Sequence, residues 1–194
     1  MATSRMEEAF SLIDAENRQD PNSSLQDDKS FPKEYLYGLR MTDCLNLHFP
    51  KASEALKLAV RGQHIRRWDI PRAQYPTGKV GYFQWRNELK RHHSECTAEI
   101  LTRVGYDEET IQRAREIISK KNLMRDRESQ TLEDVACLVF LKDYFLDFAS
   151  GHEEEKIVSI VQKTWKKMSP EAQEIALSLD LEENAARLVK MALS

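Results

Sequence analysis

Apolar residues recur at three- and four-residue spacings through most of the chain, which is the pattern of helices that bury one face. The pattern is clearest in residues 56–60, 111–118 and 135–148. No segment shows a convincing alternation of apolar and polar residues, which would predict a strand, and the chain contains only six glycines. The sequence therefore predicts an all-α fold.

Composition narrows the class of protein. With 194 residues and 41% hydrophobic content, the chain can bury a substantial core, and we expect one domain over residues 1–194. The net charge is -3, and charges of both signs are interspersed. This distribution argues against binding to a nucleic-acid polymer or to a membrane surface.

Cysteine usage and hydropathy predict a soluble, cytoplasmic protein. The three cysteines lack C-x-x-C spacing, which suggests neither a disulfide framework nor a thiolate zinc site. The first residues lack the apolar core of a signal peptide, and no later run approaches the roughly 18 apolar residues of a membrane span. The sequence leaves the oligomeric state open.

Turn-forming and capping residues divide the helical pattern into segments. Residues 18–33 are polar and contain a proline, so we expect a surface connection there. Gly105 is typical of a helix end, and Thr131 with Asp134 resembles a capping box at a helix start. The predicted helices span residues 6–17, 34–49, 54–67, 83–104, 107–123 and 132–149, with two or three more between residues 153 and 193.

The most unusual stretch is residues 58–95, which holds three of the five histidines and two of the three tryptophans. Pro71 and Pro76 forbid a continuous helix within it, so residues 69–82 are predicted to form an irregular loop. Arg72 and Lys79 lie on this loop, and we expect them to hold a phosphate or carboxylate group.

Histidines and one aspartate suggest a metal site. Neutral imidazole and carboxylate groups are ligands for divalent iron, manganese and zinc, and ligands on separate helices can leave positions open for water and substrate. The candidates are His64, the adjacent pair His92 and His93, and Asp134. In the alternative interpretation, the histidines are packed or hydrogen-bonded, and Asp134 caps a helix or complements its dipole.

Three segments resemble the HD-domain superfamily of metal-dependent phosphohydrolases. The run HIRRW at residues 64–68 is similar to its first histidine helix, and HSECTAEILTRVGYDEETIQRAREII to its second motif and following helices. LEDVACLVFL, which contains Asp134, resembles its final aspartate helix. The resemblance covers about residues 35–148 and implies an HD-like core over residues 34–150, with additional helices at both ends. The whole chain, with the motifs RGQHIRRWDIPR, GYFQWR, QTLEDVACLVFL and KTWKKMS, also closely resembles an uncharacterised family known only as a conserved domain of unknown function.

The HD resemblance implies a role for several residues. The His-Asp dyad is absent, because His93 is followed by Ser94, and His92 or Glu95 could replace the missing carboxylate. Glu95 is the candidate catalytic residue. Lys120 and Lys121 stand where many such domains carry histidines, which favours an anionic ligand over a second metal. Metal ligands and substrate-binding residues would then be His64, His92, His93 and Asp134, and Arg67, Arg72, Lys79 and Lys121.

The resemblance implies hydrolysis of a small phosphorylated metabolite or nucleotide. A bound divalent iron, manganese or zinc ion would lower the pKa of water, and the basic side chains would hold the phosphate oxygens. Iron-dependent oxygenation in the same fold is an alternative. A non-catalytic ligand sensor or scaffold with a degenerate HD site is a third, which the missing dyad favours.

Overall fold

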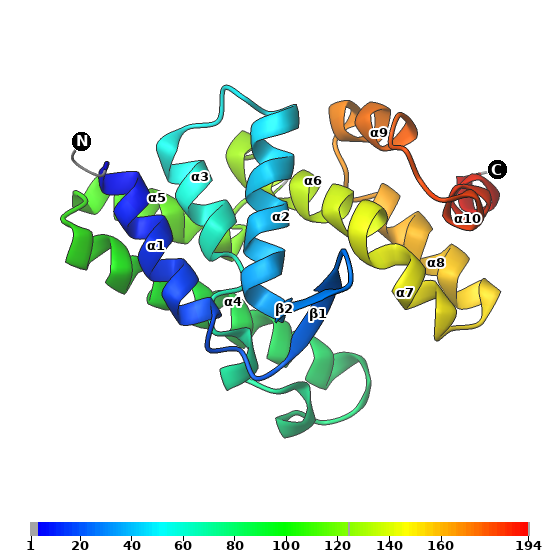
Figure 1. Ribbon diagram of the computed structural model, residues 1–194, viewed down its shortest axis with the longest axis horizontal. Helices are drawn as coiled ribbons and strands as arrows, with labels where there is room; N and C mark the ends of the chain where they lie inside the picture. The colour runs from blue at the N-terminus through cyan, green and yellow to red at the C-terminus, as the bar shows by residue number, and fades with distance from the viewer. Residues whose placement is uncertain (1–3, 124, 194) are drawn as a thin grey trace. The chain divides into compact units, whose positions relative to one another are not determined.

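The computed structural model describes residues 4–123 and 125–193, and helices dominate them (Figure 1), which confirms the predicted all-α class. Short 3-10 turns span Arg67–Asp69 and Arg72–Gln74, and a π-helical turn spans Phe140–Tyr144. The remaining elements are α1 (Arg5–Asn17), β1 (Ser23–Gln26), β2 (Lys29–Pro32), α2 (Lys33–His48), α3 (Glu54–Gly62), α4 (Gly78–Val104), α5 (Glu108–Ser119), α6 (Arg127–Val139), α7 (Phe145–Ser150), α8 (Glu154–Trp165), α9 (Pro170–Leu177) and α10 (Glu183–Leu193).

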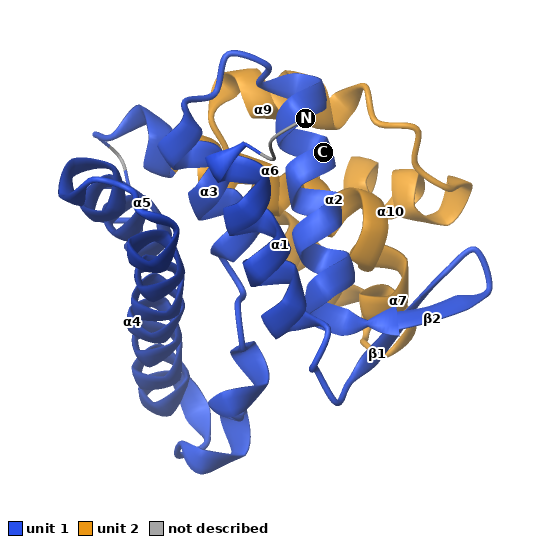
Figure 2. Ribbon diagram, turned by 60° about the vertical axis from the view of Figure 1, so that its left-hand side comes forward, with its two compact units in different colours: residues 1–129 blue, residues 130–194 orange. Residues whose placement is uncertain are grey.

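The chain divides into two compact units, residues 1–129 and 130–194, drawn in blue and orange in Figure 2. In unit 1, α1 packs against α2, α3 and α4, and the long α4 runs beside α5. α3 also contacts α2 and α5, so its apolar residues are fully enclosed. Unit 1 buries Ile13, Leu36, Met41, Leu45, Leu58, Ile65, Leu101 and Ile117.

Several helix ends lie where the sequence predicts them. The side chain of Ser53 accepts the Leu56 N–H at the start of α3, and Asp107 accepts the Thr110 N–H at the start of α5. Gly105 ends α4 with a φ of 87°, the left-handed conformation that glycine adopts without strain. These boundaries are readable from sequence because capping acts within one helical turn.

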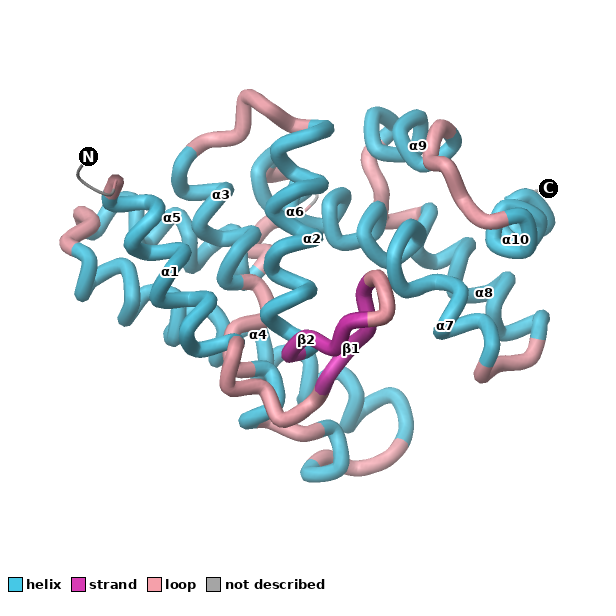
Figure 3. The backbone as a smooth tube through the Cα atoms, in the orientation of Figure 1, coloured by secondary structure: helices cyan, strands magenta, loops and turns pink. Residues whose placement is uncertain are grey.

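A short β-hairpin lies inside the segment predicted as an irregular connection, so the expectation that the chain forms no strands is wrong here. β1 and β2 pair antiparallel, as the magenta segment of Figure 3 shows. Asp27 and Asp28 form its turn with φ values of 50° and 61°, as a type I′ turn requires. The strands are mostly exposed, with Leu25 68% accessible, and therefore lack the buried alternating face that a sequence pattern would reveal.

The two helices on either side of the proline-rich loop have bounds that differ from the predicted ones. α3 ends at Gly62 rather than Arg67, so His64 lies in a turn and not on a helix. α4 begins at Gly78, five residues before the predicted start. Pro76 prevents a helix at its own position but not one that begins just after it. The connection between the two helices therefore spans residues 63–77 rather than 69–82, and it contains two 3-10 turns.

The predicted capping box of Thr131 and Asp134 is also wrong. α6 begins at Arg127, so both residues lie inside the helix. Asp126 accepts the backbone N–H groups of Glu128 and Ser129 and takes the capping role instead. The segment between the predicted helices 107–123 and 132–149 is thus mostly helical, and Met124 lies outside the described residues.

Unit 2 contains the predicted apolar helix and three later helices. α6 continues through the π-helical turn into α7, where Phe145 is fully buried. α10 contacts α7 and α8. Ser169 caps α9, and Pro170 occupies its first turn. The prediction of two or three amphipathic helices after residue 153 is confirmed.

Candidate functional site

One small pocket in unit 1 contains two of the predicted site histidines. It is formed by the turn after α3, by one face of α4 and by the end of α5. Its space of about 20 Å³ is enough for about one water molecule. We call it the basic histidine pocket, and its residues are Gln63, His64, Arg67, Arg86, Leu89, Lys90, His93, Ile118 and Lys120.

α4 supplies one wall of the pocket. Arg86, Leu89, Lys90 and His93 follow one another at spacings of one to four residues that keep them on one face of the helix. Leu89 and His93 are buried, with 2% and 3% of their surface exposed, whereas Arg86 and Lys90 are half-buried. The helix therefore presents a histidine at the floor of the pocket and cations nearer its mouth.

The turn that carries His64 is held tightly between helices. A Cβ atom at Gly62 would lie 2.3 Å from Oγ1 of Thr97 on α4, so only glycine allows this close approach. Arg66 adopts a φ of 51°, and its backbone N–H donates to the side-chain oxygen of Asn17 over 3.1 Å. A left-handed non-glycine residue costs energy and is more frequent at functional sites.

His64 is oriented by a carboxylate from α2. Its Nδ1 atom lies 3.0 Å from Oε2 of Glu34, and its ring stacks on Tyr37 with a centroid distance of 4.0 Å. The other Glu34 oxygen lies 3.7 Å from Nε of Arg67. The Arg67 guanidinium also lies over the Trp85 ring, 4.8 Å from its centroid. Glu34 thus holds both a histidine and an arginine of the pocket in place.

Burial sets the protonation of this pair. It raises the pKa of Glu34 from 4.5 to about 7, although the nearby charges of Arg67 and Lys33 act in the opposite direction. Burial, followed by the positive charges of Arg67 and Arg86, holds the pKa of His64 well below its usual value. His64 is therefore neutral at neutral pH, and one hydrogen lies between its Nδ1 atom and Glu34 whether or not Glu34 is ionised.

His93 is fixed by the backbone. Its Nδ1 atom donates to the carbonyl oxygen of Ile65 over 2.7 Å, and its ring centroid lies 5.7 Å from that of His64. Burial and then the neighbouring His64 lower the pKa of His93 well below its usual value. Its Nε2 atom is buried and has no hydrogen-bond partner among the described residues.

Four cationic side chains line the pocket, namely Arg67, Arg86, Lys90 and Lys120. Lys120 ends α5 in the left-handed conformation, with a φ of 55°, at a position where glycine or asparagine is usual. The backbone conformation therefore costs more here than it would with glycine. The sequence predicted Lys121 as the ligand-binding lysine, but Lys120 is the one that lines the pocket.

Arg72 and Lys79 both lie outside the residues that line the pocket, and Lys79 lies in the first turn of α4 rather than on the predicted irregular loop. Arg72 donates to the carbonyl oxygens of Tyr75 and Pro76 over 3.0 and 2.9 Å, so it holds its own loop together. Lys79 is exposed, and its Nζ atom lies 6.0 Å from the centroid of the Phe83 ring. That Arg72 and Lys79 hold a phosphate or carboxylate group stays a prediction.

Glu95 and Lys121 line a different surface groove between α4 and α5. Glu95 accepts two hydrogen bonds from Arg91, at 2.9 and 3.0 Å, and Lys121 forms an ion pair with Glu116 at 3.1 Å. These are exposed or half-buried ion pairs, whose usual contribution is about 0–1 kcal/mol. The structure thus separates the predicted catalytic carboxylate and substrate lysine from the residues that line the histidine pocket.

The other two predicted metal ligands have partners of their own. His92 Nε2 lies 3.1 Å from the carbonyl oxygen of Arg66. Asp134 belongs to unit 2, where its Oδ1 atom accepts from the backbone N–H of Ser169 and from Gln130, and its Oδ2 atom accepts from the Ser169 hydroxyl. Asp134 thus supports the residue that caps α9. Its convergence with the histidines of unit 1 stays a prediction.

The comparisons with known proteins place the chain in a family. The sequence model described as "Domain of unknown function (DUF4202)" matches residues 7–189. The chain belongs to the DUF4202 family. The predicted membership of a conserved family of unknown function is confirmed, and the HD resemblance stays a prediction. Searches of curated proteins and of solved structures found no match.

The residues of this DUF4202 chain fit a metal ion only in part. His64 and His93 each have one ring nitrogen held by a carboxylate or a carbonyl group, as metal-ligating histidines usually do. Within residues 4–123 and 125–193, however, no three histidine, cysteine, aspartate or glutamate side chains are grouped so that they could hold a metal. The surrounding cations also oppose a divalent cation.

Sequence reasoning missed Glu34, Tyr37, Arg86 and Lys90. The last two follow a spacing of four residues and lead to His93 three residues later, so a basic stripe on α4 was a usable signal. Glu34 gave no such signal, because an acidic residue at a helix start is typical of any helix.

Among the described helices of this DUF4202 chain, none is both long and apolar enough to cross a membrane.

Proposed function

We propose that unit 1 binds a small anionic metabolite, carrying a phosphate or carboxylate group, in the basic histidine pocket. The observation that carries the proposal is the grouping of Arg67, Arg86, Lys90 and Lys120 around two neutral histidines. Arginine and lysine side chains are the donors that phosphate and carboxylate oxygens accept most strongly. This proposal takes up the non-catalytic ligand sensor, one of the alternatives raised by the sequence, and assigns its ligand to the basic histidine pocket.

The arrangement of the cations supports ligand binding over a purely structural role. Arg67 is already oriented by Glu34 and by the Trp85 ring, so little side-chain freedom is lost when it binds an anion. Lys120 lines the pocket from a backbone conformation that a lysine adopts only at a cost. Such strain is most often retained where a side chain has a task.

A phosphohydrolase is the second candidate, and the Glu34–His64 contact favours it. A histidine whose orientation is set by a carboxylate is the usual arrangement of a general base or acid. A phosphorylated ligand in the pocket would lie beside this histidine. The metal-dependent form of the reaction rests on the HD resemblance, and no feature of the pocket favours the oxygenase alternative.

Titration of the full chain with inorganic phosphate tests the proposal. We expect binding detectable by calorimetry, and Arg86→Ala should weaken it about tenfold, since a charge-assisted hydrogen bond contributes roughly 1.5–3 kcal/mol. Arg91→Ala is the matched control, because Arg91 lies on the same helix but pairs with Glu88 and Glu95 on the surface. Absence of phosphate binding, or equal weakening by both variants, would overturn the proposal.

Metal analysis separates the two candidates. The hydrolase predicts near-stoichiometric iron, manganese or zinc in protein purified without chelators or affinity histidines, and loss of this metal in His64→Ala. It also predicts metal-dependent turnover of phosphomonoesters. The binding proposal predicts phosphate affinity that a chelator leaves unchanged.

A further inference from the structure

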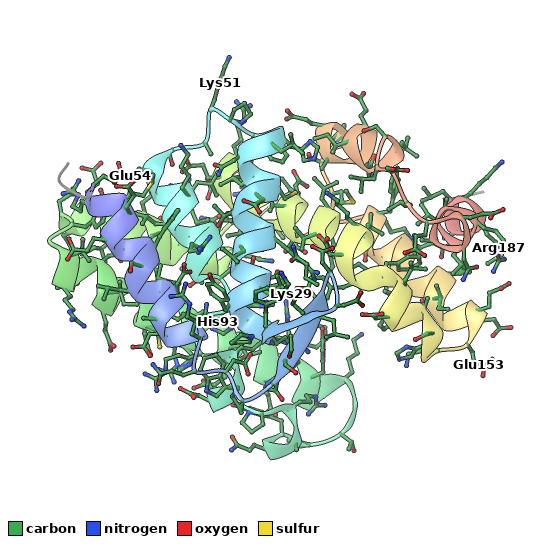
Figure 4. All side chains as sticks on the ribbon, viewed as in Figure 1. Lys29, Lys51, Glu54, His93, Glu153 and Arg187 are labelled. Carbon is green, nitrogen blue, oxygen red and sulfur yellow. The ribbon has the colours of Figure 1, made fainter. Side chains whose placement is uncertain are left out.

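His93 presents a buried nitrogen atom that the rest of unit 1 leaves without a partner. The residue, which is labelled in Figure 4, is only 3% exposed. One ring nitrogen, Nδ1, is 2.7 Å from the carbonyl oxygen of Ile65. The other, Nε2, is buried and has no hydrogen-bond partner among the described residues. Buried polar atoms are rarely left in this state.

The Ile65 contact decides which nitrogen carries the hydrogen. A carbonyl oxygen can only accept a hydrogen bond, so Nδ1 of His93 must be the donor. The ring is neutral, because a second hydrogen would place a positive charge on a buried nitrogen that has no partner among the described residues, in a pocket already lined by four cations. A neutral imidazole carries one hydrogen, and Nε2 therefore presents a lone pair.

The pocket thus combines positive donors with one buried acceptor. A fully deprotonated anion would satisfy the cations but would direct a second lone pair at His93. Resting on the proposed function, we infer that the pocket selects an oxyanion that still carries a proton, namely hydrogen phosphate or the monoanion of a phosphomonoester. The hydroxyl hydrogen of such a group donates to Nε2, and its remaining oxygens accept from the cations.

This inference narrows the ligand class. Carboxylates and sulfate keep no proton at neutral pH, whereas inorganic phosphate keeps at least one. The space of about 20 Å³ must widen to admit phosphate, and long side chains that line it can allow this by a change of rotamer. His93 and His64 are held by their Nδ1 contacts and stay in place.

The test is a calorimetric titration of the full chain with inorganic phosphate and with sulfate at neutral pH, matched ionic strength and with a chelator present. We expect phosphate to bind at least tenfold more tightly than sulfate. Equal affinities would overturn the inference and leave the proposed anion site standing. If neither anion binds, the inference and the proposed function both fail.

A variant assigns the selectivity to His93. The side-chain amide of asparagine in His93→Asn can still donate to the Ile65 carbonyl while removing the acceptor at Nε2. We expect this variant to bind phosphate and sulfate with affinities within a factor of about three, because the lost contact is worth about one hydrogen bond. A phosphate preference that persists in folded His93→Asn would overturn the role of His93.

Nitrogen NMR of the wild-type imidazoles decides the matter even if that variant fails to fold. In the free protein, the chemical shift of His93 Nε2 should be that of an unprotonated imidazole nitrogen. It should change on addition of phosphate but not of sulfate. A protonated Nε2, or an unchanged resonance with bound phosphate, would contradict the inference. The titration is then repeated with glycerol phosphate near pH 6, where about half of a phosphomonoester is singly charged. This repeat shows whether the pocket binds free phosphate or a phosphate ester.

Discussion

The carboxylate of Glu34 lies 3.0 Å from Nδ1 of His64, although the two residues are 30 positions apart in the chain. Glu34 opens α2 and His64 follows α3, so the contact exists because α2 packs against α3. Glu34 is 6% exposed, and its carboxyl group also neighbours Arg67. This single side chain therefore links the fold of unit 1 to the charge state of the basic histidine pocket.

Glu34 should make stability depend on pH in an unusual direction. Its pKa is 4.5 in an unfolded chain and about 7 when folded, so the folded protein binds the proton more tightly between these values. The contribution of Glu34 to the free energy of unfolding is therefore fully present below about pH 4.5 and is lost as the pH rises towards 7. A shift of this size corresponds to about 3 kcal/mol. Glutamine does not titrate, so Glu34→Gln does not lose this contribution. Between pH 4.5 and 7, the free energy of unfolding of the variant relative to that of wild type should rise by the same amount.

Urea unfolding of both proteins at several pH values measures this difference. The depressed pKa values of His64 and His93 act in the opposite direction, since their stabilising effect increases as the pH rises towards 6.5. Comparison with Glu34→Gln cancels most of this contribution, because both proteins keep the histidines. A stability difference that is constant from pH 4.5 to 7 would contradict the raised pKa of Glu34.

Lys120→Gly should stabilise the protein and weaken its ligand binding. Glycine adopts the left-handed φ of 55° without strain, so the free energy of unfolding should increase by about 1 kcal/mol. The same change removes a cation from the pocket, and phosphate affinity should fall severalfold. Thermal unfolding and phosphate titration measure the two effects. Lys121→Gly is the control, since Lys121 pairs with Glu116 on the surface and its removal should leave phosphate affinity unchanged.

Gly62→Ala should destabilise unit 1 and disturb the position of His64. The added methyl group would lie 2.3 Å from Oγ1 of the fully buried Thr97, and overpacking of this kind costs about 1–3 kcal/mol. Gly38→Ala is the matched control, because a Cβ atom there meets its nearest neighbour at an ordinary 3.5 Å. Gly38 lies within α2, so this alanine should be neutral or slightly stabilising. Similar melting temperatures for the two variants would contradict the close approach of α3 to α4.

Asp134→Ala should destabilise unit 2. Asp134 is 2% exposed, and its carboxylate accepts from both the backbone N–H and the hydroxyl of Ser169, the residue that caps α9. We expect a loss of about 2 kcal/mol, and a smaller loss, within roughly 1 kcal/mol, for Asp134→Asn, which keeps one acceptor. Chemical unfolding measures both. If Asp134 is instead the metal ligand that the HD resemblance implies, Asp134→Asn should release bound metal while its stability barely changes.

Several features of this protein follow from local sequence. The spacing of apolar residues predicts the helices, including starts near residues 54 and 107, and Gly105 predicts the end of α4, because capping bonds and glycine conformations act over about one helical turn. His64 and His93 are recognisable as candidates from residue type alone. The β-hairpin is not, since its four-residue strands are mostly exposed and carry no alternating pattern.

Only tertiary structure decides which side chains share a site. Glu34 meets His64 through helix packing, and His93 meets the carbonyl of Ile65 across 28 residues. Lys120 ends α5 and lines the pocket, whereas the next residue, Lys121, lines the surface groove between α4 and α5. Such choices depend on burial and on long-range contacts, whose energies are set by the whole unit. A sequence pattern records only which residues lie near one another along the chain.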